Sequence, residues 1–133
     1  MKPASVSSCL SVIVACGVSV ACGNPSAPVI ADDLTVQAAA PNLEFTNQSA
    51  APVYTVIVDA DRIGVFLWAP CTDPATCNAL QPSEHRQVPY TKIFGYSPSS
   101  SREAIVRWWH LVPDSTSGTG FRADSIRSIL VGL

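Results

Sequence analysis

Two cysteines and two histidines are the side chains of this chain best suited to chemistry. Cys71, Cys77, His85 and His110 could supply the four sulfur and nitrogen ligands of a zinc ion. Their spacing fits no standard zinc pattern, because the cysteines lie close together and the two histidines are isolated. The sequence therefore predicts a disulfide between Cys71 and Cys77, with no metal site and no cofactor.

Three other groups could support catalysis or metal binding. Gly95–Ser99 reads GYSPS, which nearly matches the nucleophile elbow of hydrolases, but the last position is serine instead of glycine. Asp59 and Asp61 lack the further oxygen ligands and the glycine of an EF-hand calcium loop. Glu84 and Glu103 could act as an acid–base pair only if the fold brought them together. We therefore expect a protein without catalytic activity, and a small hydrolase that uses histidine and carboxylate groups is the alternative.

Aromatic side chains are the best candidates for a recognition surface. Trp108 and Trp109 are adjacent in an expected strand, so their rings point to opposite faces. Ile105 and Arg107 share the face of Trp109, which predicts that Trp109 is the exposed ring. An exposed Trp109 beside Arg107 could stack on a sugar ring or anchor a protein partner. The alternative is that Arg107 covers Trp109 through a cation–π contact.

The N-terminus has the pattern of an export signal. Lys2 supplies one positive charge, and residues 9–20 form an uncharged, largely apolar run that is too short to cross the hydrocarbon core of a bilayer. The run leads into the sequence SVACG, whose cysteine is Cys22. This segment resembles the signal peptide and cleavage box of bacterial lipoprotein precursors. The resemblance implies that Cys22 is acylated and becomes the new N-terminus, although Ser19 stands where that family usually has an aliphatic residue.

Two alternatives to acylation at Cys22 remain open. Cys16 follows the residues IVA, which match the family's box better at its first position, but cleavage there leaves a short apolar core. An ordinary secretory signal, cut after Ala21 or Ala31, would leave no lipid on the protein.

The number of cysteines agrees with acylation at Cys22. The chain has five cysteines, which is an awkward odd number for an exported protein. Cleavage before Cys22 removes two of them and acylation occupies Cys22, so that only Cys71 and Cys77 remain to pair in an oxidising compartment. We therefore expect a protein of the bacterial cell envelope that is exported and held by its lipid at the outer membrane or on the periplasmic face.

The chain has room for one folded domain. It is 133 residues long and 47% hydrophobic, with a formal net charge of −2. This charge argues against a nucleic-acid partner, which would require a clustered basic surface. We expect a signal peptide at 1–21, a flexible tether rich in alanine and proline at 22–42, and a folded domain at 43–133.

Short apolar runs between turn residues predict an all-β domain. Its central element is an expected hairpin in which runs 53–58 and 63–68 are joined by polar residues. Pro89 places another expected strand, at 85–88, on a sheet edge. A helix at 103–112 is the alternative to a strand there, because Ser100 and Glu103 could form a capping box. The remaining expected strands are 43–47, 91–96 and 125–133.

Six or seven such strands predict a small antiparallel β-sandwich. The pattern vaguely resembles immunoglobulin-like domains, although the Cys…Trp…Cys spacing of that family is absent. The functional expectation is a lipid-anchored envelope protein that acts by binding or by structural contact. Its expected partners are the membrane, through the N-terminal lipid, and a protein or a glycan. A carbohydrate-binding module that uses Trp109 is a further alternative.

Overall fold

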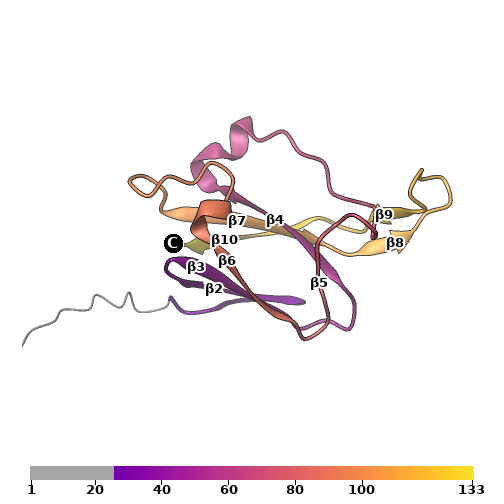
Figure 1. The fold of residues 1–133 in the computed structure, drawn as a ribbon, viewed down its shortest axis with the longest axis horizontal. Helices are drawn as coiled ribbons and strands as arrows, with labels where there is room; N and C mark the ends of the chain where they lie inside the picture. The colour runs from indigo at the N-terminus through magenta and orange to yellow at the C-terminus, as the bar shows by residue number, and fades with distance from the viewer. Residues whose placement is uncertain (1–25) are drawn as a thin grey trace, which may run out of the picture.

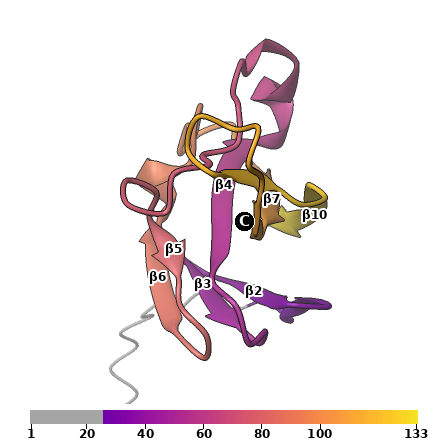
Figure 2. The ribbon, with the colours of Figure 1, turned by 90° about the vertical axis from the view of Figure 1, so that its right-hand side faces the viewer.

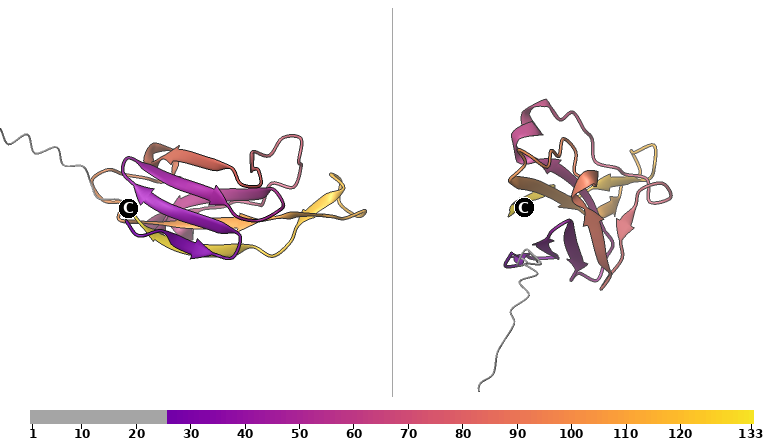
Figure 3. Two further views of the ribbon diagram at one scale, coloured as in Figure 1. Left: turned by 90° about the horizontal axis from the view of Figure 1, so that it is seen from below. Right: turned by 60° about the vertical axis from the view of Figure 1, so that its left-hand side comes forward.

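The computed structural model describes residues 26–133, which form two antiparallel sheets packed face to face (Figures 1 and 2). The all-β architecture expected from the sequence is confirmed. One sheet has the strand order β1-β2-β3-β6, with bounds Val29–Ala31, Leu34–Ala39, Asn42–Asn47 and His85–Pro89. The other has the order β10-β7-β4-β5, with bounds Arg127–Gly132, Glu103–Trp109, Val53–Asp59 and Ala79–Leu80. Strands β8 (Leu111–Pro113) and β9 (Phe121–Ala123) form a separate hairpin at one end of the molecule (Figures 1 and 3).

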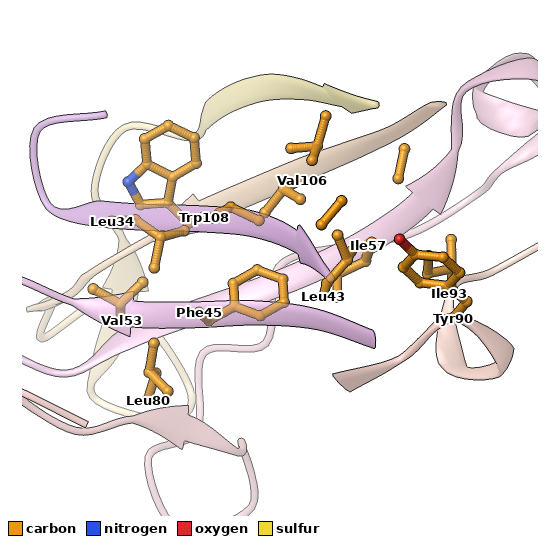
Figure 4. Packing of buried hydrophobic residues seen from close by; sticks show 14 residues of the cluster. Leu34, Leu43, Phe45, Val53, Ile57, Leu80, Tyr90, Ile93, Val106 and Trp108 are labelled. Carbon is orange, nitrogen blue, oxygen red and sulfur yellow. The ribbon is translucent and has the colours of Figure 1, made fainter. Parts of the chain in front are cut away.

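The core lies between the two sheets. In β2 and β3, apolar residues alternate with half-exposed ones, so one face of each strand is buried. The opposing sheet contributes Val53, Ile57, Val106 and Trp108 to the same cluster, in which Leu34 and Phe45 come from the first sheet (Figure 4). The sandwich is therefore held by apolar side chains from both layers.

The expected flexible tether at 22–42 is wrong over its described part. Residues 29–39 form β1 and β2, which pair with each other and continue into β3. Leu34, Val36 and Ala38 are buried, which is the two-residue period of a half-buried strand. Their burial supplies the stabilisation that a flexible tether lacks. The expected signal peptide at 1–21 and the acylated Cys22 lie outside the described residues.

The expected central hairpin is also wrong in its second half. Strand β4 ends at Asp59, and the chain then forms a 3-10 helix, η1 (Ala60–Val65). The carboxylate of Asp59 caps this helix by accepting a hydrogen bond from the N–H of Asp61 at 2.9 Å. The chain that follows crosses the outer face of the β4 sheet, and Phe66 and Trp68 pack there against other aromatic rings. Residues 63–68 therefore do not pair with β4 as a second hairpin strand, because this segment packs against the outer face of the sheet.

Several predictions for the second half of the chain are confirmed. Residues 103–109 form strand β7 and not a helix, and β10 buries Val131 as the apolar alternation predicted. Strand β6 lies on a sheet edge, as Pro89 indicated. The expected strand at 91–96 is wrong, because a short 3-10 helix, η2 (Tyr90–Lys92), is followed by a single bridge between Phe94 and Val58. In residues 26–133, no helix is long and apolar enough to cross a membrane.

Candidate binding cleft

The two sheets are closed along one side and open along the other. Strands β1 and β2 contact β10 on the closed side. On the open side, β4 and β5 of one sheet and β6 of the other border a cleft of about 400 Å³. This volume lies in the range of small-ligand sites. The cleft is lined by Phe45, Thr55, Val56, Ile57, Phe66, Asn78, Leu80, Arg86, Val88, Lys92 and Phe94.

Apolar side chains make most of the cleft wall. Ile57 and Leu80 belong to the hydrophobic core, and Val88 packs against it. Phe66 and Phe94 lie in contact, with ring centroids 4.5 Å apart. Phe94 is 49% exposed, although a large apolar ring is stabilised by leaving water. The cleft therefore offers an apolar wall with a partly exposed aromatic ring.

The edge of β4 is only partly paired within the cleft. Strand β5 pairs with Val53 and Tyr54, and Phe94 forms the next contact along the edge, at Val58. The N–H of Phe94 donates to the carbonyl of Ile57 at 3.0 Å. Because the N–H and C=O of one residue leave a strand on the same side and alternate along it, the Ile57 N–H and the Thr55 carbonyl point to this edge too. Neither group has a backbone partner among the residues that the structure describes.

Arg86 bridges the two sheets at one end of the cleft. Its guanidinium donates to the Glu84 carboxylate, to the carbonyl of Ala79 at 2.8 Å and to the Asn78 side chain at 3.2 Å. The backbone N–H of Gln81 donates to the same Glu84 carboxylate at 2.7 Å, and this bond, with Arg86 adding to it, holds the pKa of Glu84 below its ordinary value. The charge of Arg86 is thus offset by Glu84.

Lys92 is the exposed cation of the cleft. It lies at the end of η2 and borders the cleft near Phe94. No carboxylate of residues 26–133 forms an ion pair with it. The cleft therefore has one positive charge without an internal counter-ion, beside its apolar wall.

The prediction that Trp109 is exposed is wrong. Trp109 is 3% exposed, and its ring lies against Tyr54 and Trp68, with centroid distances of 6.3 and 5.5 Å. Its Nε1 donates a hydrogen bond to the carbonyl of Cys71 at 3.1 Å. Arg107 does lie over an aromatic ring, but this ring is Trp68, at 5.3 Å from its centroid. The chain after η1 covers this face, and no local signal in the sequence indicated that it would.

The disulfide prediction is confirmed. Cys71 and Cys77 are bonded, with their Cα atoms 5.9 Å apart. The bond closes a short loop next to the carbonyl that receives the Trp109 hydrogen bond. It therefore fixes the end of the segment that covers the outer face of the β4 sheet.

His110 meets a carboxylate, which is the arrangement that the hydrolase alternative requires. Its Nε2 lies 2.9 Å from Asp33 Oδ2, and its Nδ1 lies 2.8 Å from the carbonyl of Pro52. Both ring nitrogens are thus engaged by oxygen atoms of the protein, and neither is left to contact a substrate. The same Asp33 oxygen accepts a hydrogen bond from Arg127 at 2.8 Å. These hydrogen bonds connect the β1–β2 turn to the sheet that contains β7, which is a structural role.

The other candidate residues are not brought together. The hydroxyl of Ser97 contacts only that of Ser99, at 3.2 Å, in a turn that is not followed by a helix. His85 contacts the Thr46 hydroxyl at 3.1 Å on the exposed face of the first sheet. Glu84 is engaged by Arg86, whereas Glu103 begins β7 opposite Gly132 in the other sheet. Within the described part of the chain, no group of three or more His, Cys, Asp or Glu side chains could hold a metal ion.

Comparison of the chain with protein-family models, with curated proteins and with solved structures gave no match. Function therefore has to be inferred from the cleft itself. Sequence reasoning missed its residues, because the cleft joins segments 55–57, 66, 78–80, 86–88 and 92–94. No local signal in the sequence indicated that these short segments would meet.

Proposed function

We propose that this protein is an exported, lipid-anchored envelope protein that binds a ligand without catalysis. The binding site is the cleft between β4 and β6. The observation that carries the proposal is the opening of the sandwich at this side, where apolar side chains, unpaired main-chain groups and the ammonium of Lys92 border one cavity. A cavity with apolar walls and a few polar groups is the usual form of a ligand site.

The anchoring half of the proposal depends on the N-terminal sequence. An apolar run that leads into a small-residue box and Cys22 supports acylation at that cysteine. Cells that express the chain are labelled with a radioactive fatty acid, and we expect label on the wild-type protein and none on Cys22→Ala. Label that survives Cys22→Ala, or no label on the wild type, contradicts anchoring at Cys22. Cys16→Ala is the matched variant, because it removes only the competing site.

The binding half is tested with small ligands and nuclear magnetic resonance. A panel of small apolar acids, amines and amides is titrated into the 15N-labelled full chain. We expect some members to shift the amide signals of Thr55, Ile57 and Phe94 together, and we expect Val88→Trp, which fills the cleft, to abolish these shifts. The variant Ile30→Trp is the control, because Ile30 is 70% exposed and lies in β1, on the closed side of the sandwich. A panel in which no member moves the cleft amides contradicts the proposed function.

A further inference from the structure

The chain that follows η1 has an inner aromatic side and an outer aliphatic side. Phe66 is extended, with φ −89° and ψ 100°, and its ring stacks with that of Trp68 at a centroid distance of 6.3 Å. Trp68 packs in turn on the buried Trp109. Because side chains alternate along an extended chain, Val65 and Leu67 point to the other side, away from the protein. Val65 is 71% exposed and Leu67 is 98% exposed.

These two residues form an apolar tip, and packing within the domain does not account for it. Leu67 is the most exposed large apolar side chain in residues 26–133, and Val65 is the next. Such side chains are stabilised by leaving water, and neither does so here. Figures 1 and 2 show that η1 and the chain after it stand out from the sandwich on the side opposite β2 and β3. The apolar tip is therefore a protrusion and not part of a groove.

Three cations lie around the base of the apolar tip. Arg107 lies over the ring of Trp68, at 5.3 Å from its centroid. Lys92 borders the same cleft as Phe66, and Arg62 is an exposed residue of η1 itself. Within the described range, no carboxylate forms an ion pair with any of the three. Their charges are thus available to an external anionic partner.

The carboxylates of this stretch of chain do not cancel the cations. Residues 59–68 contain Asp59 and Asp61. Asp59 is buried and caps η1, so that Asp61 is the exposed carboxylate there. Three cations against two carboxylates leave a net positive charge around the apolar tip, in a chain whose formal net charge is −2. Exposed aliphatic side chains beside Lys and Arg are the combination that binds the surface of an anionic bilayer.

The shape of the tip favours a bilayer over a protein partner. Protein interfaces are anchored mainly by aromatic and arginine side chains that enter pockets of the partner. Here the aromatic rings of Phe66 and Trp68 are already packed on the domain, and the exposed side chains are aliphatic. An aliphatic protrusion can enter the acyl region of a bilayer without a complementary pocket, because lipid chains rearrange around it.

We propose that the apolar tip inserts into the interface of an anionic lipid bilayer. Val65 and Leu67 lie among the acyl chains just below the headgroups, and Arg62 and Lys92 lie at the level of the lipid phosphates. This contact is separate from the cleft ligand and from acylation at Cys22. It goes beyond the proposed function by giving the folded domain a membrane contact of its own.

The test uses the 15N-labelled full chain with Cys22→Ala, so that no acyl group is present. The probe is a bicelle of equal parts phosphatidylcholine and phosphatidylglycerol, with a nitroxide near the headgroup end of one acyl chain. We expect the amide signals of Val65 and Leu67 to broaden, and those of Ile30 and Thr119 to stay sharp. The apolar run at 9–20 can also bind lipid, so the position of the broadening decides. Broadening that is equal at Ile30 and Leu67, or absent from both, overturns the proposal.

Apolar variants supply the second arm of the test. We expect Leu67→Ser to raise the lipid concentration for half-maximal broadening at Val65 about tenfold, because one large aliphatic side chain no longer enters the acyl region. Ile30→Ser is the matched control, because Ile30 is 70% exposed and lies in β1 of the other sheet. Both replacements are at exposed positions, and circular dichroism checks that both variants are folded. Equal shifts from the two variants contradict insertion of the apolar tip.

Charge variants test the anionic headgroups. We expect Lys92→Gln to raise the half-maximal lipid concentration about fivefold on the mixed bicelles and to have no effect on phosphatidylcholine alone. Arg122→Gln removes the same charge from β9, in the separate hairpin at one end of the molecule (Figure 3), and should have little effect. Equal effects of the two variants, or equal binding to both kinds of bicelle, overturn the anionic bilayer as the partner.

The remaining rival is an interface between copies of this chain. Analytical ultracentrifugation without lipid tests it. A monomer agrees with the proposal, whereas a dimer that Leu67→Ser dissociates assigns the apolar tip to self-association and overturns it. None of these measurements involves a ligand in the cleft, so the proposed function stands or falls separately.

Discussion

His110 and Asp33 are 77 residues apart in the sequence, and their side chains meet with Nε2 and Oδ2 2.9 Å apart. Arg127 donates to the same Asp33 oxygen at 2.8 Å and to Asp124 at 2.9 Å. The N–H of His110 donates in turn to Asp124. Four polar side chains thus join the β1–β2 turn to the far end of the other sheet. They hold the β1–β2 hairpin, whose residues the sequence predicted to be a flexible tether, against the rest of the domain.

Removal of the Asp33 carboxylate should loosen this connection. We expect Asp33→Ala to lower the free energy of unfolding by about 1–2 kcal/mol, because it leaves His110 and Arg127 without their shared acceptor. The expected loss is modest because all three side chains are partly exposed to solvent. Urea unfolding measures the change. The neighbouring Asp32→Ala is the control, since Asp32 is exposed and should change stability by less than about 0.5 kcal/mol. Equal effects of the two variants contradict the role given to Asp33.

Asn47 should be among the most sensitive polar positions. Its side chain is fully buried, its Nδ2 donates to the carbonyls of Ala51 and Leu80, and its Oδ1 accepts from the N–H of Ser49. We expect Asn47→Ala to cost about 3 kcal/mol in urea unfolding, because it leaves several buried groups unpaired.

Asn47→Asp should be at least as harmful, because it presents a carboxylate to two carbonyl oxygens. Asn42→Ala, at the other end of β3, is the matched control, since the Asn42 side chain forms no hydrogen bond with another residue in the described range. A small loss from Asn47→Asp would show that the two donated bonds matter little.

Loss of the disulfide should weaken the covering of the outer face. The bond closes a loop with a sequence separation of 6, for which chain entropy predicts a stabilisation of about 2 kcal/mol. Replacing Cys71 and Cys77 together by serine should lower the free energy of unfolding by that amount. It should also shift the fluorescence of Trp109, whose Nε1 donates to the Cys71 carbonyl. A reductant should act on the wild type and leave the double variant unchanged; the same response in both contradicts this assignment.

At acidic pH, the fold should lose the stabilisation that the Glu84 carboxylate provides. Its pKa in the folded state is lowered, first by the hydrogen bond from the Gln81 N–H. A carboxylate with a lowered folded pKa stabilises the fold above its unfolded pKa, and this contribution is lost as the pH falls through the folded pKa. We therefore expect Glu84→Gln to be less stable than the wild type at neutral pH, with the difference fading as the pH drops below about 4.

Urea unfolding at a series of pH values measures this difference. Glu103→Gln is the control, because Glu103 is exposed and its carboxylate receives no hydrogen bond within residues 26–133. A gap between wild type and Glu84→Gln that stays constant from neutral pH to pH 3 would contradict the assigned role of the Gln81 hydrogen bond.

Local pattern was sufficient for the parts of the fold in which one strand buries one face. The alternation at Leu43 and Phe45, the density of β-branched and aromatic residues from Ile105 to Trp109, and Pro89 at an edge each predicted a strand that the structure contains. The cysteine pair followed from spacing and count. These features depend on near neighbours in the chain, where period and covalent chemistry act directly.

Only the tertiary structure decided what lies over the outer face of the β4 sheet and where the sandwich opens. Trp109 is buried because a segment about forty residues earlier in the chain folds across it. The same segment includes part of 63–68, which therefore does not form the second strand of the expected hairpin. The cleft, in turn, exists because β5 begins only at Ala79, opposite Tyr54, and Phe94 pairs only at Val58. Such contacts depend on the summed packing energy of distant segments, which a local residue pattern does not contain.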